Sequence, residues 1–311
     1  MSTSTAKSKI DFRPITTEDK QVYEKFLAKS GVRGCEFSFA NLYLWGRQSI
    51  SIGEDSVFIF SQFNQKTVYP FPLGEHDVHS AFDSIIADAR ARGIACRITG
   101  ITERDRELLE DFYPGRFRYH MNEGSFDYVY SIDDLADLPG KKYDGKRNHL
   151  RRFRDAFPHC VPEPITDGNA REALDFIDEW YATRLAENPE ADFQMERCAL
   201  NKAMRDREAL GLVGLMLRDG DRVLALTLAS RLSEDTFDVH FEKARADVQG
   251  AYPAINCALA RHIRETHPEV RYLDREEDMG IEGLRRSKRS YHPHHMIKKW
   301  WACLLDEEYE Y

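Results

Sequence analysis

The alternation of apolar and polar positions in the first half of the chain predicts short strands joined to amphipathic helices. Thr16 and Thr17, followed by acidic residues and then by apolar residues at helical spacing, predict a capped helix that ends at Gly31. Alternating residues on both sides of Gly53-Glu54-Asp55 predict a β-hairpin. The strands expected in this half cover residues 11–15, 49–52, 56–62, 68–71, 94–99, 116–120 and 126–129, and the later helices cover residues 78–92 and 103–112.

The second half begins with helical patterns and then changes to strands. Pro139 and Gly140 interrupt regular structure, so we place the domain boundary nearby, with domains at residues 1–132 and 133–311. The order that follows is β-β-β, loop, α, β, α, β, and the first half runs in the same order. Helices are expected at residues 148–157, 169–188, 197–210, 252–266 and 281–290, and strands at 212–217, 223–231, 236–242, 270–274 and 296–304.

Length and composition agree with two packed domains. The chain has 311 residues, which is more than a single hydrophobic core usually supports, and 42% of them are hydrophobic. No stretch approaches the roughly 18 consecutive apolar residues of a membrane span. The N-terminal residues also lack the apolar segment of a secretory signal. We therefore expect a cytoplasmic protein without an integral membrane segment.

Cysteine spacing and charge exclude several classes of protein. The six cysteines are scattered and form no CxxC pair, which favours reduced thiols over a disulfide frame or a structural zinc site. The net charge of −9 argues against a protein that coats nucleic acid. Residues 141–154 nevertheless hold seven Lys and Arg residues against one acid, Asp144, which gives a local charge of +6. A second basic run covers residues 285–289.

The segment around Gly250 leads from a predicted strand into a helix with Pro253 near its start. Free N–H groups and the helix dipole at such an N-terminus bind phosphate or carboxylate, and small residues allow a close approach. The alternative is that Gly250 only turns the chain before an ordinary helix.

The order of elements resembles the GNAT superfamily of acyltransferases, in which the loop after the fourth strand cradles the pyrophosphate of acyl-CoA. Gln249-Gly250-Ala251 looks like a shortened form of that loop, whose pattern is Gln/Arg-x-x-Gly-x-Gly/Ala. The resemblance implies an α/β (α+β) fold of two tandem GNAT-like domains with mixed central sheets flanked by helices. It also implies a degenerate N-terminal domain without the phosphate loop, and an active site in the C-terminal domain.

A second motif runs from Gly283-Leu284 through Lys288 to Tyr291-His292-Pro293. It is similar to the Gly-Leu-x-x-Phe-Lys-x-x-Phe-Gly segment of the Fem enzymes and of the phosphatidylglycerol lysyltransferase C-terminal domain. In those families the lysine faces the phosphates or terminal adenosine of aminoacyl-tRNA, so the resemblance gives Lys288 that role. Together with residues 141–153, 240–244, 249–256 and 275–284, the motif resembles a soluble bacterial family classed with that C-terminal domain.

Acyl transfer to an amine requires a base for the acceptor and an acid for the leaving group. Glu242, at the end of a central strand, is the expected base; its alternative role is an ion pair with Lys243 or a neighbouring arginine. Tyr291 stands where many GNAT enzymes keep the acid for the leaving group, although a core aromatic would look the same in the sequence. With Lys288, these two residues form the expected catalytic set.

Two further sets of residues complete the expected site. The acids that follow the strand at residues 270–274 lie where open α/β sheets bind ligands and could recognise an amine, or could simply cap the next helix. The expected substrate-binding residues are His240, Glu276, Glu277 and Asp278, and the expected cofactor-binding residues are Gln249, Gly250, Ala251, Tyr252, Asn256, Arg147 and Arg151. The basic helix that carries the two arginines could hold tRNA phosphates or a lipid headgroup, or be merely solvated.

The sequence thus predicts an acyltransferase that moves an aminoacyl or acyl group from aminoacyl-tRNA or acyl-CoA to an amine or hydroxyl. The tRNA acceptor end and a small-molecule, peptide or lipid-headgroup acceptor are the expected partners. The alternatives are an acetyl-CoA-dependent N-acetyltransferase and a non-catalytic protein that binds an anionic ligand or tRNA. No metal is expected, because His294 and His295 would point to opposite faces of a strand.

Overall fold

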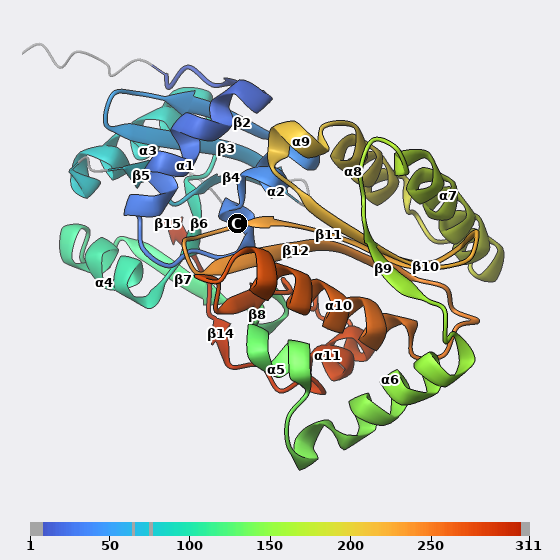
Figure 1. Ribbon diagram of the computed structural model, residues 1–311. Coiled ribbons are helices and arrows are strands. Elements are labelled where there is room, and N and C mark those ends of the chain that lie inside the picture. The colour runs from blue at the N-terminus through green and yellow to red at the C-terminus, as the bar shows by residue number, and fades with distance from the viewer. Residues whose placement is uncertain (1–8, 64–65, 75–76, 306–311) are drawn as a thin grey trace, which may run out of the picture. The chain divides into compact units, whose positions relative to one another are not determined.

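The computed structural model describes residues 9–63, 66–74 and 77–305, and the chain divides into two compact units (Figure 1). The first unit combines Met1–Phe126 with Ile297–Tyr311, and the second unit is Asp127–Met296. Each unit is built on its own sheet.

The first unit holds an eight-stranded sheet in the order β1-β2-β3-β4-β6-β15-β7, with β5 paired to β3. Its strands are β1 (Arg13–Pro14), β2 (Gln48–Ile52), β3 (Ser56–Phe63), β4 (Lys66–Pro70), β5 (Leu73–Gly74), β6 (Arg97–Ile101), β7 (Phe117–Met121) and β15 (Trp300–Leu304). Its helices are α1 (Lys20–Lys29), α2 (Phe39–Leu44), α3 (Val78–Arg92) and α4 (Glu103–Phe112), with 3-10 turns η1 (Thr17–Asp19), η2 (Cys35–Phe37) and η3 (Glu123–Ser125).

Local signals in the sequence determine where the helices of this unit begin and end. The side chain of Asp77 caps α3, which ends at Gly93 in the left-handed conformation. Thr102 and Asp105 form a reciprocal capping box at the start of α4. Both helices occupy the predicted ranges, because these end signals are local and strong.

The second unit holds a seven-stranded sheet in the order β14-β8-β13-β12-β11-β10-β9. Its strands are β8 (Asp127–Ser131), β9 (Val161–Pro164), β10 (Val213–Asp219), β11 (Arg222–Arg231), β12 (Thr236–Ala244), β13 (Tyr272–Asp274) and β14 (His295–Ile297). Its helices are α5 (Ile132–Asp137), α6 (Asp144–Ala156), α7 (Ala170–Glu187), α8 (Gln194–Arg205), α9 (Arg207–Leu210), α10 (Ala251–Thr266) and α11 (Glu282–Arg289), and the 3-10 turn η4 (Lys141–Tyr143) precedes α6.

Helices cover both faces of this second sheet. The long helix α10 lies along one face beside α5 and α6, and α7 and α8 lie over the other face (Figure 1). The apolar residues of α10 recur at helical spacing and join a buried core with β10, β11 and β12. Strand β11 is buried along nearly its whole length, as a central strand with both faces covered must be.

A gap opens in this sheet because β12 and β13 pair over only three residues. Their parallel pairing ends at Asp238 and Asp274, whereas β12 continues to Ala244. A β-bulge in the β11–β12 pairing leaves His240 without a residue opposite it. His240 and Glu242 therefore lie on the part of β12 that β13 does not cover.

The division of the chain differs from the expected domains 1–132 and 133–311 in two places. Strand β8 pairs with β13 of the second sheet, so the second unit begins at Asp127 rather than after residue 132. The expected single strand at residues 296–304 is two strands, because β14 belongs to the second sheet whereas β15 pairs with β6 and β7 of the first. Strand β8 thus joins the second sheet and β15 joins the first. Both assignments depend on pairing between residues far apart in the sequence, which the alternation of apolar and polar residues does not reveal.

Four helices and strands were absent from the expected set, namely α2, α5, β5 and β9. Strand β5 has two residues, which are too few to show alternation. Helices α2 and α5 have six residues each, which is too short for a helical period to stand out. Strand β9 contains Pro162 and Pro164 and lies at the edge of its sheet, where proline is tolerated.

We expect Gly250→Ala to destabilise the second unit by about 2 to 4 kcal/mol. Gly250 has φ 85°, and a Cβ there would lie 2.5 Å from the His149 carbonyl oxygen and 3.0 Å from the Phe153 Cβ. Gly220→Ala is the matched control, since its φ of 60° costs about 1 kcal/mol but nothing lies within 4 Å of the new Cβ. Urea unfolding measures the loss of stability in both variants. An equal loss in Gly250→Ala and Gly220→Ala would contradict the packing argument.

Candidate functional site

Glu242 lies in the gap beside β12 and is nearly buried. The Arg275 Nη2 atom donates to Glu242 Oε1 at 2.8 Å, and the Asn256 Nδ2 atom, from α10, donates to Oε2 at 3.3 Å. The side chains of Arg275 and Glu242 are 13% and 10% exposed. The sequence offered Lys243 or a neighbouring arginine as the ion-pair partner of Glu242. The partner is Arg275, and Lys243 pairs with Glu196.

Two polar atoms beside this ion pair have unused hydrogen-bonding capacity. Within the described residues, Arg275 Nη1 and Asn256 Oδ1 are buried and have no hydrogen-bond partner. Because burying such atoms unsatisfied costs about 1–3 kcal/mol each, their presence is typical of a site that a ligand completes. Arg275 Nη1 is a donor and Asn256 Oδ1 is an acceptor, so the two atoms suit a ligand that offers both an acceptor and a donor, such as an amide.

Lys146, on α6, faces the same site and was not among the expected catalytic residues. Its Nζ lies 3.7 Å from the ring centroid of Tyr291. Burial, together with the nearby charge of Arg275, lowers the pKa of Lys146 to about 8. A lysine with this pKa is partly neutral in mildly alkaline solution and can accept a proton. In the sequence it is one member of a basic run, and nothing there marks its burial.

Tyr291 lies in the core at the edge of this site, with 3% of its surface exposed. Its ring also faces the Arg275 guanidinium, 4.9 Å from the ring centroid, and its carbonyl accepts a hydrogen bond from Tyr143. Burial raises the pKa of Tyr291, so its hydroxyl stays protonated at neutral pH. The expected roles of core aromatic and proton donor are both compatible with this position.

Gly250, at the N-terminus of α10, is required by the packing of this helix against α6. Gly250 permits the close contact with His149 and Phe153 of α6, which supports the reading in which this glycine serves packing. Ala251 N–H bonds to Val248 at 3.3 Å, and Pro253 has no N–H, so few donors of the first turn remain for an anion. Gln249, just before the glycine, is exposed.

Tyr252 connects this helix start with Glu242. It is 37% exposed, and burial of its hydroxyl together with the charge of Glu242 raises its pKa. Of the expected cofactor residues, Asn256 and Tyr252 therefore lie at Glu242, and Gly250 and Ala251 begin the same helix. Arg151 is exposed on α6. Arg147 instead donates to the carbonyls of Leu138 and Gly140 and pairs with Asp144, which fixes the turn before α6.

Lys288 does not extend into an anion site. Its ammonium donates to the carbonyl of Arg275 and, at 3.1 Å, to that of Glu276. The Tyr130 hydroxyl donates in turn to the Lys288 carbonyl at 2.8 Å. The lysine is 8% exposed, and its contacts hold the loop that carries Arg275. Its expected role at the donor phosphates therefore stays a prediction that these contacts do not favour.

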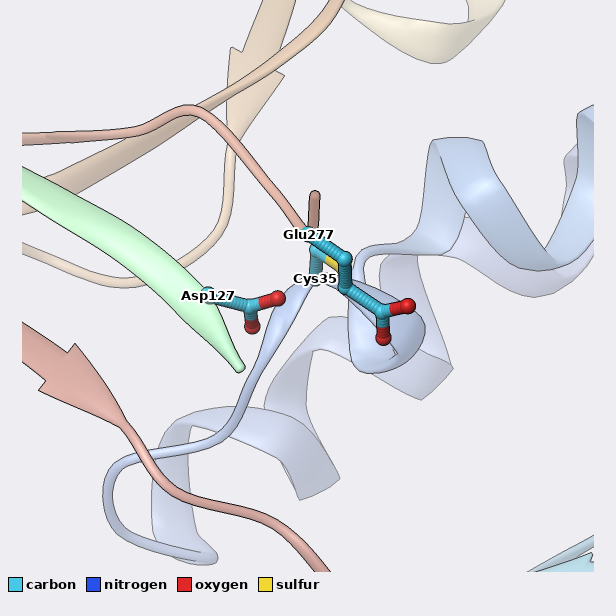
Figure 2. A group of neighbouring side chains, drawn as sticks. All are labelled: Cys35, Asp127 and Glu277. Carbon is cyan, nitrogen blue, oxygen red and sulfur yellow. The ribbon is translucent and has the colours of Figure 1, made fainter. Parts of the chain in front are cut away.

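Asp278 is likewise a structural residue of this loop. It is fully buried, accepts from the Tyr128 hydroxyl at 2.7 Å and from Gly280 N at 2.8 Å, and pairs with Arg285 through both oxygens. The Arg285 hydrogen bonds lower the pKa of Asp278 to about 2. Both carboxylate oxygens of Asp278 therefore already have hydrogen-bond partners. The neighbouring Glu277 is partly buried, and Figure 2 draws its side chain near Asp127, the first residue of β8.

One cavity of the second unit lies between α6, α10 and the strands β9 and β10. It has a volume of about 390 Å³ and is lined mainly by apolar residues, among them Leu150, Leu215 and Cys257, with Arg154 and Arg261 alongside. None of its lining residues is an expected catalytic residue. The chemistry near Glu242 therefore does not coincide with this cavity.

Comparison with known proteins establishes the family. Residues 28–303 match the family described as "Phosphatidylglycerol lysyltransferase, C-terminal". The chain belongs to this family. A conserved protein of unknown function from Bacteroides thetaiotaomicron is 35% identical, with a TM-score of 0.89 over 95% of this chain and all of that chain. The family resemblance expected from the motifs is confirmed.

More distant structures share the fold. The L-PGS structure from Bacillus licheniformis is 17% identical and has a TM-score of 0.66, covering 92% of both chains. A tandem GNAT protein from the clavulanic acid biosynthesis pathway is 10% identical, with a TM-score of 0.51 over 96% of this chain and 99% of that one. The expected α/β (α+β) fold with two tandem GNAT-like domains is confirmed.

An uncharacterised protein of Mycoplasmoides gallisepticum is 24% identical over 186 residues, which are 60% of this chain. The match spans only 58% of that relative's length. None of the helices in the described ranges is both long and apolar enough to cross a membrane.

We expect Asp278→Asn to destabilise the protein by about 1–3 kcal/mol, since it removes the buried carboxylate that accepts from Arg285, Tyr128 and Gly280. Because the Arg285 hydrogen bonds hold the pKa of Asp278 below that of a free aspartate, this stabilisation is present above about pH 4 and is lost as the pH falls toward about 2. Denaturant unfolding at neutral and acid pH measures both effects. The exposed Glu282→Gln is the control and should change little.

We expect Lys146 to react with an acylating reagent at lower pH than the exposed Lys141 does. Its pKa of about 8 gives a neutral fraction that rises through mildly alkaline pH. Competitive labelling followed by peptide mass spectrometry yields its titration curve, with exposed Lys141 as internal reference. A curve that coincides with that of Lys141 would contradict the assigned environment.

Proposed function

We propose that this chain transfers an acyl or aminoacyl group from a phosphate-bearing donor, aminoacyl-tRNA or acyl-CoA, to an amine or hydroxyl. The observation that carries the proposal is the cluster in the gap beside β12, where Glu242, Arg275, Asn256 and Lys146 meet. Family membership supports the same reaction class, because the family is described as a lysyltransferase domain.

The chemistry of the cluster suits direct attack in a ternary complex. The acceptor nitrogen or oxygen bonds to the donor carbonyl carbon, and the carbonyl π electrons move to its oxygen. Arg275 Nη1, which has no partner within the described residues, is the donor that would stabilise this oxyanion. When the carbonyl reforms, the bond to the donor oxygen or sulfur breaks, and the leaving group takes up a proton.

Glu242 and Lys146 are the two candidates for the proton acceptor. One carboxylate oxygen of Glu242 is engaged by Arg275, whereas the depressed pKa of Lys146 suits proton transfer near pH 8. We therefore assign the acceptor proton to Lys146, directly or through Glu242, and the leaving-group proton to Tyr291.

We expect Lys146→Met to lower turnover by about 10²- to 10⁴-fold, which is the usual contribution of a general base. The wild-type rate should rise with pH through about pH 8, because the neutral amine is the active form. The rate is measured in single-turnover reactions, as loss of a radiolabelled aminoacyl group from its tRNA or as release of the coenzyme A thiol from acyl-CoA. Exposed Lys141→Met is the control.

Glu242→Gln and Tyr291→Phe separate an enzyme from a binding protein. Both variants should lose most of the turnover with either donor while still binding it. Unchanged turnover in both would contradict the acyl-transfer proposal and favour a non-catalytic protein that holds an anionic ligand or tRNA. Calorimetry distinguishes the donors, since micromolar binding of coenzyme A would favour an acetyl-CoA-dependent N-acetyltransferase over the aminoacyl-tRNA version.

A further inference from the structure

We propose that Asp238, His240 and Glu276 form a binding site for a divalent transition-metal ion, with Zn²⁺ as the preferred ion. Asp238 and His240 lie on β12, and Glu276 lies on the loop after β13. All three belong to the second unit. The proposal goes beyond acyl transfer and does not depend on it.

The ligand atoms are spaced as a tetrahedral ion requires. His240 Nδ1 lies 3.4 Å from Asp238 Oδ2 and 3.4 Å from Glu276 Oε1, and the three atoms lie within 4.8 Å of one another. Zinc bonds of about 2.0–2.2 Å in tetrahedral geometry separate two ligand atoms by about 3.3–3.6 Å. Direct N–H···O hydrogen bonds are shorter, at about 2.7–3.2 Å. The observed spacing thus suits an ion between the atoms better than a direct bond.

His240 directs a ring nitrogen without a hydrogen-bond partner toward the two carboxylates. His240 Nδ1 is buried and has no hydrogen-bond partner within the described residues, and its side chain is only 1% exposed. The other nitrogen, Nε2, lies 2.8 Å from the Ser230 hydroxyl. If Nε2 carries the proton and donates it to Ser230, the Nδ1 lone pair is left for a metal. This arrangement is the usual outer support of a metal-binding histidine.

The fold holds the three side chains in place. The bulge in β12 removes the cross-strand neighbour of His240, which allows the ring to turn toward Asp238. Glu276 adopts a left-handed conformation with φ 57°, and its N–H bonds to Asp274 Oδ1 at 2.8 Å. Its carbonyl accepts from Tyr128 N and from Lys288. A strained residue held by several bonds is typical of a functional position.

Charge and access also agree with a cation. Asp238 and Asp274 are fully buried and adjacent in the parallel register, and Glu276 adds a third carboxylate. A divalent ion would offset the cost of this negative charge. The Glu276 side chain is 26% exposed, so solvent reaches the site and could supply a fourth ligand. Mixed nitrogen and oxygen donors favour Zn²⁺ over Mg²⁺.

The site borders the acyl-transfer cluster, because His240 lies two residues before Glu242 and Glu276 follows Arg275. A bound ion would join β12 to the loop that carries Arg275. The expectation of no metal rested on the histidines at residues 292–295, none of which takes part in this site.

Zinc titration of the full-length, chelator-treated protein tests the proposal without any activity measurement. Calorimetry should give about one Zn²⁺ per chain, and Co²⁺ in its place should give the visible absorption of a tetrahedral site. His240→Gln and Glu276→Gln should each weaken Zn²⁺ binding about tenfold or more. Mg²⁺ at the same concentration should not displace the ion.

His294→Gln is the matched control, since His294 and His295 form an exposed pair that could also attract zinc. It should leave the affinity unchanged. Because Glu276 is partly exposed, Glu276→Gln should keep the circular dichroism spectrum of the wild type, which separates loss of binding from loss of folding. Absence of saturable Zn²⁺ binding, or wild-type affinity in a folded Glu276→Gln variant, would overturn the proposal.

Discussion

The ion pair between Arg275 and Glu242 spans the gap where β12 and β13 stop pairing, and the arrangement of the second unit around that gap depends on it. Past Asp238 and Asp274 no ladder joins the strands, so side chains must satisfy the charge that is buried there. A buried arginine opposite a buried carboxylate is stable only if both are paired, which fixes the loop relative to β12.

The loop after β13 is held in turn by residues of the Gly283–Pro293 motif, whose lysine the family resemblance places at the phosphates of the acyl donor. Lys288 binds the carbonyls of Arg275 and Glu276, and Asp278 unites Tyr128, Gly280 and Arg285. These contacts fix the loop that carries Arg275. Loss of the Lys288 side chain would therefore displace Arg275 as well as remove a positive charge.

The sequence could predict most of the elements but not the pairings between distant ones. Helices α3 and α4 have strong caps and were predicted residue for residue, and the strand order around α10 indicated the GNAT-like fold. The transfer of β8 to the second sheet and of β15 to the first could not be read from alternation, because the same pattern fits either sheet. Non-local pairing determines such assignments.

The candidate site shows the same limit at the level of single residues. Glu242, Asn256 and Tyr291 were predicted from motifs, and the structure brings them near one another. Lys146 was hidden in a basic run, because the burial that lowers its pKa depends on Tyr291, which lies 145 residues further along the chain.

The same contacts link the protonation of Lys146 to the ion pair between Arg275 and Glu242. Arg275 binds Glu242, and its positive charge also disfavours a proton on Lys146. If the Arg275 guanidinium turned toward a developing oxyanion, its charge would be partly neutralised, and Lys146 would take up a proton more readily. Proton removal from the acceptor and charge build-up on the carbonyl oxygen would then be coupled through one arginine.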